Sequence, residues 1–374
     1  MSANAHLKFE TLDGLRGVGA LIVVVGHTLL FWIGRYPGPI AGAVMVDMFF
    51  MLSGFVIAFA YEPKIAKGNF GVARFMEARI VRLYPLFLLS LLFGMLTNLV
   101  IGYGETDAWL APIWHFGVSA FFIPVYDPDV SPSIYPLNLP AWTLFWELIV
   151  NFIYILVWRW LSTRMLIAFV IAGAAGLLTA GIVFDTLNIG VDWTSTIGAF
   201  ARAWFGFFVG VLIFRKTSEK RAAPLPRTPL VFALVALLIA IAFYGLPLKG
   251  TPARLAWEIF FICIMGPVIV YLGQRFEPPK FISPTFVWLG AISYALYLFH
   301  WPIYLIALRI PAKIGMNQGA TAPYMGFAVL IVAVCVAAVA ERYYDRPVRK
   351  WISLQLNKRP GRHRAEPAAK AAAE

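Results

Sequence analysis

Long apolar stretches, separated by short polar segments, fill almost the whole chain. Ten of them are long enough to cross the roughly 30 Å hydrocarbon core of a membrane as helices. These stretches span residues 17–33, 40–60, 83–101, 139–158, 166–184, 194–214, 229–246, 255–273, 286–308 and 322–340. The pattern predicts an all-α membrane protein, built as a bundle of about ten transmembrane helices.

Composition agrees with this pattern and excludes a soluble domain. Hydrophobic residues make up 60% of the 374 residues and charged residues only 13%, and the mean hydropathy is +0.76. No signal peptide is predicted, because acids as well as bases precede the first apolar stretch and no small-residue cleavage site follows it. The two cysteines, Cys263 and Cys335, lie inside predicted spans, so neither a disulfide framework nor a metal site is indicated.

The basic residues indicate how the chain crosses the membrane. If the N-terminus is cytoplasmic, 25 of the 31 Lys and Arg residues fall in inner segments, five fall in outer segments and Arg202 lies within a span. This bias predicts that both termini face the cytoplasm. The net charge of +12 then reflects topology and contact with anionic lipids rather than nucleic-acid binding.

No linker, repeat or low-complexity block divides the chain between residues 12 and 345. We therefore expect one transmembrane domain, 1–350, followed by a basic, Ala-rich cytoplasmic tail, 351–374, that is disordered. The longest outer segment, 102–138, contains five prolines and no Lys or Arg, which is typical of a structured cap. Its apolar middle has 15 residues, too few to span. The fifth, seventh and eighth apolar stretches are nearly featureless and are interpreted as scaffold.

The stretch LDGLRGVGALIVVVGH, residues 12–27, combines charge at the start of an apolar helix with a histidine inside it. Asp13 and Arg16 lie where the membrane helix would begin. His27 follows Arg16 by eleven residues, roughly 16 Å further along a helix. Ionisable groups inside a membrane are costly and usually functional, so His27 is the first candidate catalytic residue.

Four further ionisable residues lie inside predicted spans. Counting from the outer helix ends places Asp47, Glu147, Arg202 and His300 with His27 in one layer, roughly 9–12 Å below the outer surface. Glu147 and Arg202 are natural partners at one level, and Glu147 or Asp47 can orient the His27 ring. The alternatives are structural ion pairing for Asp47 and Arg202, and packing against a neighbouring helix for His300.

Two arginines form a second candidate site at the cytoplasmic surface. The segment ARIVRLYP, residues 78–85, places Arg79 and Arg82 three residues apart on one side of a predicted helix. Two guanidinium groups on one face suit a phosphate group. The alternative for either arginine alone is ordinary anchoring of a cytoplasmic loop.

Several separated motifs together resemble the acyltransferase 3 family of bacterial membrane O-acyltransferases. They are the Asp-Gly-Leu-Arg segment followed by His27, the FFMLSGF run, ARIVRLYP, the segment from Trp142 to Glu147, and SYALYLFHWP. The resemblance covers about residues 9–350. It implies a multi-pass protein of the bacterial inner membrane that moves an acyl group, most often acetyl, from cytoplasmic acyl-CoA to a hydroxyl group of an envelope glycan, oligosaccharide or glycolipid.

The resemblance also implies roles for individual residues, and their positions agree with the chemistry. Phosphates of acyl-CoA that enters from the cytoplasm would meet the arginines, and the extended pantetheine arm would reach His27. The predicted catalytic residues are His27, Glu147 and His300; the predicted donor-binding residues are Arg16, Arg79 and Arg82; and Asp13, Asp47, Arg202 and Trp142 support them. No metal and no permanently bound cofactor is expected, since acyl-CoA is a co-substrate.

The sequence leaves the mechanism open. His27 can act as general base on the acceptor hydroxyl group or carry the acyl group as an acyl-imidazole, and an unperturbed imidazole pKa of about 6.5 suits both roles. Arg202 can neutralise the tetrahedral oxyanion. Many relatives carry a fused extracytoplasmic SGNH domain, whereas only a short tail follows the tenth stretch here. The chain therefore either completes the transfer itself or passes the acyl group to a separate extracytoplasmic transferase.

Two other classes of protein place charges inside a helical bundle. A secondary transporter or flippase uses such charges for coupling, but the motifs of the first five stretches are not repeated in the last five, as paired transporter halves would require. An assembly scaffold would not need Arg16 and His27 aligned on a path from the cytoplasm. The enzyme is therefore the favoured interpretation.

Overall fold

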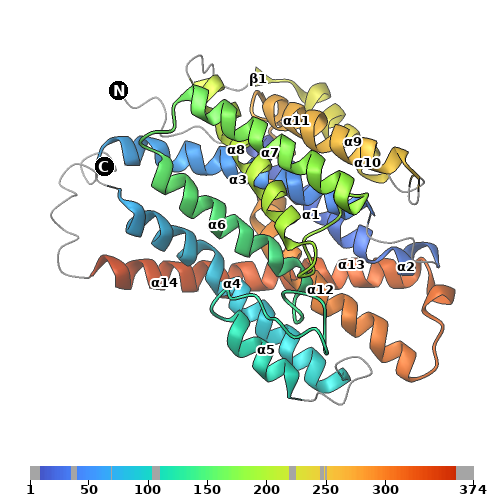
Figure 1. Ribbon diagram of the computed structural model, residues 1–374. Coiled ribbons are helices and arrows are strands. Elements are labelled where there is room, and N and C mark those ends of the chain that lie inside the picture. Colours follow the sequence, from blue (N-terminus) through green and yellow to red (C-terminus); the bar gives the residue numbers. More distant parts are fainter. Residues whose placement is uncertain are drawn as a thin grey trace.

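The computed structural model describes residues 9–34, 40–68, 70–102, 110–218, 225–244, 248 and 251–358, and over these ranges the chain is a helical bundle (Figure 1). The α-helices are α1 (Glu10–His27), α2 (Leu29–Ile33), α3 (Ile40–Ala66), α4 (Val72–Ile101), α5 (Ala111–Ser119), α6 (Trp142–Val157), α7 (Thr163–Phe184), α8 (Thr196–Ser218), α9 (Thr228–Tyr244), α10 (Ala253–Phe260), α11 (Gly266–Gly273), α12 (Ser283–Lys313), α13 (Tyr324–Val339) and α14 (Arg346–Asn357). The 3-10 turns η1 (Leu139–Ala141) and η4 (Gln318–Thr321) and the π-helical segments η3 (Phe261–Met265) and η5 (Ala340–Asp345) adjoin or connect them. Strands β1 (Leu225–Pro226) and β2 (Phe276–Glu277) form one short parallel pair.

Each predicted apolar stretch coincides with a helix or a run of joined helices. In the described part of the chain, eight of these are long and apolar enough to cross a membrane, and α9 is a shorter apolar helix. Helix α1 also has the length of a membrane span, but three charged residues, Glu10, Asp13 and Arg16, lie in its first two turns. The predicted all-α membrane fold is confirmed, whereas the number of spans and the side on which the termini lie stay predictions.

Close packing between α3 and α8 sets the middle of the bundle. A Cβ atom on Gly210 of α8 would collide with the Met51 carbonyl of α3, and one on Gly54 of α3 would collide with the Phe207 carbonyl of α8. Glycine at these positions lets the two backbones approach, which is a common way to pack membrane helices. Helix α1 packs against α3 and also against α12, so these four helices surround the interior that carries the ionisable residues.

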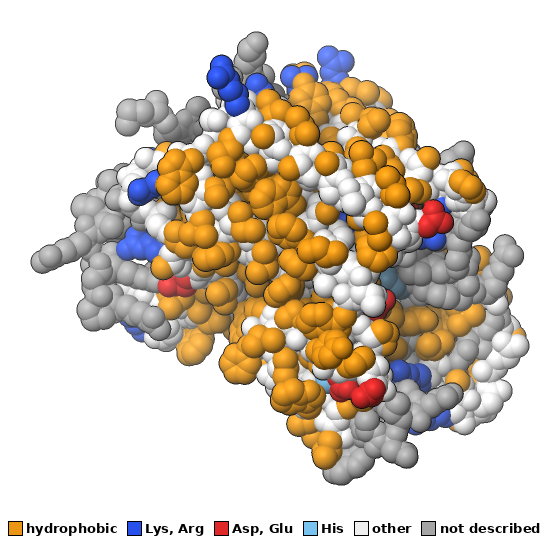
Figure 2. Space-filling model, in the orientation of Figure 1, with side chains coloured by type: hydrophobic (Ala, Val, Ile, Leu, Met, Phe, Trp, Pro, Cys, Tyr) orange, Lys and Arg blue, Asp and Glu red, His pale blue; other side chains and the backbone are white. Residues whose placement is uncertain are grey.

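The surface of the bundle is apolar where α6 and α7 face outward. Figure 2 shows hydrophobic side chains covering most of this face, with Lys and Arg side chains along its upper and left edges. Large side chains of α7 are strongly exposed, including Ile171 at 63%, Ile182 at 78% and Val183 at 67%. Such a surface is stable against lipid and not against water. The chain is therefore a multi-pass membrane protein.

The outer segment between α4 and α6 is folded over its described part, residues 110–138. Its apolar middle forms only the nine-residue helix α5, so the prediction that this stretch does not span is confirmed. The rings of Phe87 and Phe122 stack with centroids 4.1 Å apart, and the Tyr135 hydroxyl donates to the Phe122 carbonyl at 2.7 Å. His115 lies 2.9 Å from Asp127. These contacts tie the cap to α4.

The predicted disordered tail needs one correction. Helix α14 continues to Asn357, so the first seven residues of that tail are helical. The helix follows η5 without a break, and its Arg349 pairs with Asp345 one turn earlier, at 2.8 Å. This pairing extends the helix beyond its apolar part. Residues 359–374 lie outside the described residues.

Candidate functional site

Two adjacent cavities lie inside the bundle, each with a volume of about 180 Å³. The first, here called the arginine cavity, is lined by residues that include Arg16, Ser53, Arg79, Arg82, Glu147 and Tyr294. The second, the histidine cavity, is lined by residues that include His27, Trp142, Asp192, Ser195, Arg202 and Trp301. Val46 and Tyr297 line both cavities, so these two side chains form part of the wall between them.

Arg16 is held against helix α12 at the edge of the arginine cavity. Its Nε donates to the Ser293 hydroxyl at 3.0 Å, and its Nη2 donates to the Gly290 carbonyl at 2.8 Å and to Asp13 at 2.9 Å. The close approach of the two helices makes this possible, since a Cβ atom on Gly290 would lie 2.9 Å from the Asp13 carbonyl oxygen. Asp13 thus orients Arg16, as its predicted supporting role requires, and the guanidinium remains half-exposed at the cavity.

Glu147 lies in the arginine cavity and pairs with Arg79. Its Oε1 accepts from Arg79 Nη2 at 2.7 Å and from the Ser53 hydroxyl at 2.7 Å. Both ionic side chains are largely buried. The prediction that Glu147 pairs with Arg202 and lies in one layer with His27 is therefore wrong. Ser53, which no sequence signal singled out beyond its place in FFMLSGF, completes this cluster.

The start of helix α6 explains why the depth of Glu147 was misjudged. Residue counting took the helix to begin at the outer surface. Leu139, Pro140 and Trp142 instead line the histidine cavity, so α6 begins at the level of His27. Glu147 follows Trp142 by five residues, about 7.5 Å further along the helix at the usual rise, and therefore reaches the other cavity.

Arg82 completes the arginine cavity and contacts the C-terminal part of the bundle. Its Nη1 lies 3.4 Å from Asp345, a fully buried acid that Arg349 also contacts at 2.8 Å. Its guanidinium lies 5.6 Å from the centre of the Tyr294 ring. The structure thus brings Arg16, Arg79 and Arg82, from two helices, to one cavity, and each of them has an acid as partner: Asp13, Glu147 and Asp345, respectively.

His27 is the last residue of α1 and reaches the histidine cavity. Its Nδ1 lies 2.9 Å from the Val23 carbonyl oxygen, one turn earlier. Because a carbonyl oxygen only accepts hydrogen bonds, Nδ1 carries the proton and Nε2 of the neutral ring keeps its lone pair. The expectation that Glu147 or Asp47 orients this ring is wrong, since both carboxylates are occupied by arginines and the backbone holds the imidazole instead.

His300 lies directly behind His27. The two ring centroids are 5.1 Å apart, and His300 Nδ1 lies 3.3 Å from the Leu296 carbonyl oxygen of its own helix. The His300 side chain is fully buried, and its Nε2 has no hydrogen-bond partner in the described part of the chain. His300 is not among the described residues that line either cavity. The structure thus places His300 in contact with the His27 ring, and its predicted catalytic role stays a prediction.

Asp47 and Arg202 form a buried ion pair beside the histidine cavity. Arg202 donates to the two oxygens of Asp47 at 3.0 and 2.7 Å. It also donates to the Ala43 carbonyl at 2.8 Å and the Ile189 carbonyl at 2.7 Å, and its guanidinium lies 5.3 Å from the centre of the Trp142 ring. This is the structural pairing that was the alternative for both residues. The pair neutralises both charges, so the acid and the base contribute no net charge to the cavity.

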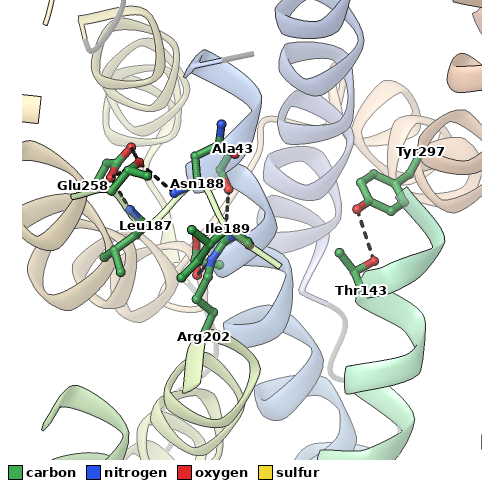
Figure 3. A network of polar contacts seen from close by, with 10 residues as sticks. Ala43, Thr143, Leu187, Asn188, Ile189, Arg202, Glu258 and Tyr297 are labelled. Carbon is green, nitrogen blue, oxygen red and sulfur yellow. Dashed lines mark hydrogen bonds and ion pairs between the residues drawn. The ribbon is translucent and has the colours of Figure 1, made fainter. Parts of the chain in front are cut away.

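Polar residues that the sequence interpretation missed hold the loop between α7 and α8 (Figure 3). Glu258, fully inside the predicted span 255–273, accepts from the Leu187 amide at 2.5 Å, from the Thr186 hydroxyl at 3.0 Å and from Arg254 at 2.9 Å. The sequence feature that could have revealed Glu258 is an acid inside an apolar stretch that was interpreted as scaffold. Asp192 follows in the same loop, and its position between two spans gave no sign that it lines a cavity.

Tyr297 closes the wall between the cavities from helix α12. Its hydroxyl donates toward Thr143 Oγ1 at 3.2 Å and the Pro140 carbonyl at 3.3 Å, both at the start of α6 (Figure 3). Its ring packs edge-on against Phe49, with centroids 5.8 Å apart. The aromatic ring therefore bridges two helices at the level where one cavity ends and the other begins. Among the described residues no group of three His, Cys, Asp or Glu side chains is placed to hold a metal ion.

These features define a multi-pass membrane protein whose interior has a cationic cavity next to one that exposes an imidazole nitrogen. The chain belongs to the acyltransferase 3 family: the family model described as "Acyltransferase domain" matches residues 9–342. The protein is therefore an acyltransferase. No solved structure matches it.

Relatives of known name agree with this membership. Protein 2 in picA locus of Rhizobium radiobacter is 36% identical over 165 residues, which cover 41% of this chain and 84% of that protein. Exopolysaccharide production protein ExoZ of Rhizobium meliloti is 23% identical, over 82% of this chain and 89% of that protein. Peptidoglycan O-acetyltransferase OatA of Listeria monocytogenes is 23% identical over 91% of this chain, which spans only 56% of the length of OatA.

Proposed function

We propose that this protein is an O-acyltransferase of the bacterial inner membrane, which moves an acyl group, acetyl in the first instance, from cytoplasmic acyl-CoA to a hydroxyl group of an envelope glycan, oligosaccharide or glycolipid. One observation carries the proposal. The arginine cavity and the histidine cavity share a wall that includes Val46 and Tyr297, so acyl-CoA held by its phosphates in the first cavity brings its thioester within about one side chain of the imidazole in the second.

The arginine cavity is suited to the CoA part of the donor. Three guanidinium groups line it. Arg16 and Arg79 each pair with one acid, whereas Arg82 shares Asp345 with Arg349, so this side of the cavity keeps one positive charge in excess and offers several guanidinium donors to phosphate groups. The basic segments of the sequence support a cytoplasmic position for this cavity. The relatives named for peptidoglycan or exopolysaccharide support an envelope glycan as acceptor.

The histidine cavity is suited to the transfer step. In the general-base route, Nε2 of His27 takes the proton of the acceptor hydroxyl group while the oxygen attacks the thioester carbonyl. The tetrahedral intermediate then expels the CoA thiolate, which takes the proton back from the imidazolium, leaving an ester and free CoA. In the acyl-histidine route Nε2 attacks the carbonyl itself, the C–S bond breaks, and the CoA thiolate leaves with the proton that the acyl-imidazolium gives up. The acceptor hydroxyl group then attacks the acyl-imidazole, which yields the ester and the neutral imidazole. The Nδ1 hydrogen bond to Val23 keeps Nε2 available in both routes.

Purified protein in lipid nanodiscs, supplied with radiolabelled acetyl-CoA and a glycan acceptor, tests the proposal. His27→Ala should lower acetyl transfer by about a thousandfold, while the Kd for CoA stays within about twofold because the arginine cavity is untouched. Acetyl transfer that survives His27→Ala contradicts the proposed role, and acceptor movement across the membrane without acylation identifies a carrier. Acetylation by this chain alone excludes the need for a separate extracytoplasmic transferase.

A further inference from the structure

The loop between α7 and α8, residues 185–195, forms one wall of the histidine cavity. Residues 188–192 of this loop line the cavity opposite His27, together with Ser195. The loop turns at Gly190, which has φ of +113°, a conformation that side chains rarely allow. A Cβ atom there would also lie 2.5 Å from the Ala199 side chain and 3.1 Å from the Trp142 ring. The wall therefore has a fixed shape.

Buried polar residues hold the backbone of this loop from both sides (Figure 3). Glu258 accepts from the Leu187 amide, and Arg202 donates to the Ile189 carbonyl at 2.7 Å. The Gly190 amide donates to the Ser195 hydroxyl at 3.0 Å, and the Val191 carbonyl accepts from the Ile134 amide at 2.9 Å. Each residue from Leu187 to Val191 thus has one backbone N–H or C=O group in a hydrogen bond, since the Asn188 amide also donates to the Thr186 hydroxyl. What the loop offers to the cavity is its side chains.

Asp192 is the ionisable side chain that this rigid loop presents to the cavity. Its carboxylate has no hydrogen bond or ion pair to the described part of the chain, although the residue is half-buried. Burial raises the pKa of this carboxyl above the usual range of aspartate, with no cation nearby to lower it. An unpaired acid at the edge of a cavity is costly unless a ligand supplies its hydrogen bonds.

The other polar groups of the cavity determine which ligand fits this acid. Arg202 is neutralised by Asp47, and neutral His27 presents a lone pair rather than a proton at Nε2. Both Asp192 and His27 therefore accept hydrogen bonds. The Trp142 and Trp301 side chains add aromatic surface. Asn188, whose side-chain amide both donates and accepts, also lines the cavity. The cavity therefore suits a ligand that donates and accepts hydrogen bonds, has an apolar face and carries no negative charge beside Asp192.

We propose that Asp192 makes the histidine cavity a binding site for an uncharged sugar ring, two of whose neighbouring hydroxyl groups donate to the carboxylate, and that the same carboxylate excludes anionic sugars such as uronates. This inference rests on the proposed function for its biological meaning, since it names the acceptor class. Asp192 binds the acceptor, while Glu258 and the Asp47–Arg202 pair position its loop.

Equilibrium binding to the full chain in nanodiscs tests the assignment without any turnover. The probes are radiolabelled n-octyl β-D-glucopyranoside and n-octyl β-D-glucuronide below their micelle concentrations, corrected for uptake by empty nanodiscs. They share ring and tail and differ in one carboxylate. Asp192→Asn keeps the shape and removes the charge. Asp185→Asn is the matched control, because Asp185 lies in the same loop and is exposed.

The wild-type protein should bind the glucoside at least about tenfold more tightly than the glucuronide, because hydrogen bonds to a charged acceptor are the strong ones. Asp192→Asn should weaken glucoside binding by about tenfold and narrow the gap between the probes, whereas Asp185→Asn should change neither. Three results would overturn the assignment. They are equal glucoside binding by Asp192→Asn and Asp185→Asn, a preference of the wild type for the glucuronide, and no binding of either probe by the wild type. No acetyl transfer by the wild type, or acetyl transfer that survives His27→Ala, would instead contradict the proposed function, whatever the binding results.

Discussion

The arginine cavity and the histidine cavity have similar volumes and a common wall but opposite chemistry. In the arginine cavity, cationic side chains outnumber acids, and the arginines are oriented by partners from other helices, as Arg16 is by Ser293 and Arg79 by Glu147. In the histidine cavity the charged pair Asp47–Arg202 is closed on itself, and an imidazole and a carboxylate remain available. The proposed ligands differ accordingly: phosphate groups for the first cavity and hydrogen-bond donors for the second.

Charged residues inside the bundle therefore serve two purposes. Buried ion pairs contribute little to stability, but breaking one leaves an unpaired charge in a medium that solvates it poorly. The Asp47–Arg202 pair holds the loop that shapes the histidine cavity, because Arg202 also donates to the Ile189 carbonyl. Both members of the Arg79–Glu147 pair instead line their cavity, whereas only Arg202 of the other pair does, so the Arg79–Glu147 pair remains within reach of a ligand. Burial alone therefore does not identify a functional charge.

The largest effect expected within this comparison is the loss of donor binding when the arginine cavity is neutralised. Arg79→Gln combined with Arg82→Gln should raise the KM for acetyl-CoA by about a hundredfold, since each lost charged contact to phosphate costs roughly 1.5–3 kcal/mol. The KM for the acceptor should change little, because neither arginine is among the described residues lining the histidine cavity. Steady-state kinetics with both substrates varied gives the two values.

Arg74→Gln is the control for this double variant. Arg74 belongs to the same helix and is not among the described residues that line either cavity, so the donor KM should stay near the wild-type value. Glu147→Gln in the same assay reports whether the acid acts only through Arg79. An unchanged KM for acetyl-CoA in the double variant would show that neither arginine binds the donor. A raised KM for the acceptor would show that donor and acceptor do not bind in separate cavities.

How far the sequence anticipates this arrangement depends on which physical signal each residue carries. Hydrophobic pattern located the helices, because burial in lipid imposes long apolar runs, and isolated charges within those runs marked His27 and Arg202. The depth of a residue within the bundle was harder to predict from the sequence. The position of Glu147 depends on where α6 begins, and that start is set by the packing of Pro140 and Trp142 in the bundle.

Pairing between distant helices was the least predictable feature. Arg202 meets Asp47 because Gly206 of α8 lies against α3, where a Cβ atom would be 2.8 Å from the Phe50 Cβ and 3.1 Å from the Asp47 carbonyl oxygen. No periodicity in one helix reveals which face of another it meets. Asp192 was missed for a related reason: the sequence does not reveal where a loop residue lies in the bundle, because its position is set only when the loop packs against its neighbours.

A smaller effect is expected when the wall between the cavities is opened. Tyr297→Ala removes the ring that lines both, so water and the thioester can meet without an acceptor. Hydrolysis of acetyl-CoA in the absence of acceptor should rise by about tenfold, because water exclusion is lost at the reacting group. Release of labelled acetate measures this directly, at saturating acetyl-CoA so that altered donor binding does not contribute.

Tyr294→Ala is the matched control for Tyr297, one turn earlier on α12. Tyr294 lines the arginine cavity and is not among the described residues of the histidine cavity, so its loss should leave hydrolysis without acceptor unchanged even where it alters donor binding. Tyr297→Phe keeps the ring and removes only the hydrogen bonds to Thr143 and Pro140, and should give an intermediate rate. Equal hydrolysis by all three variants and the wild type would show that the two cavities are already continuous.

The smallest effect concerns the response of the histidine cavity to pH. Burial raises the pKa of Asp192, so this carboxylate takes up a proton at a higher pH than an exposed aspartate does as the medium is acidified. A protonated Asp192 is a poorer acceptor, so glucoside binding should weaken as the pH is lowered from about 7 toward about 4, the ordinary range of an aspartate. His27 lines the same cavity in every variant, so the decisive quantity is the difference between the wild type and Asp192→Asn. That difference should shrink as the pH falls, because acid gives the wild-type side chain the neutral form that asparagine imitates. A constant difference over this range would mean that Asp192 stays charged throughout, and that its carboxylate is more exposed to water than its place in the loop indicates.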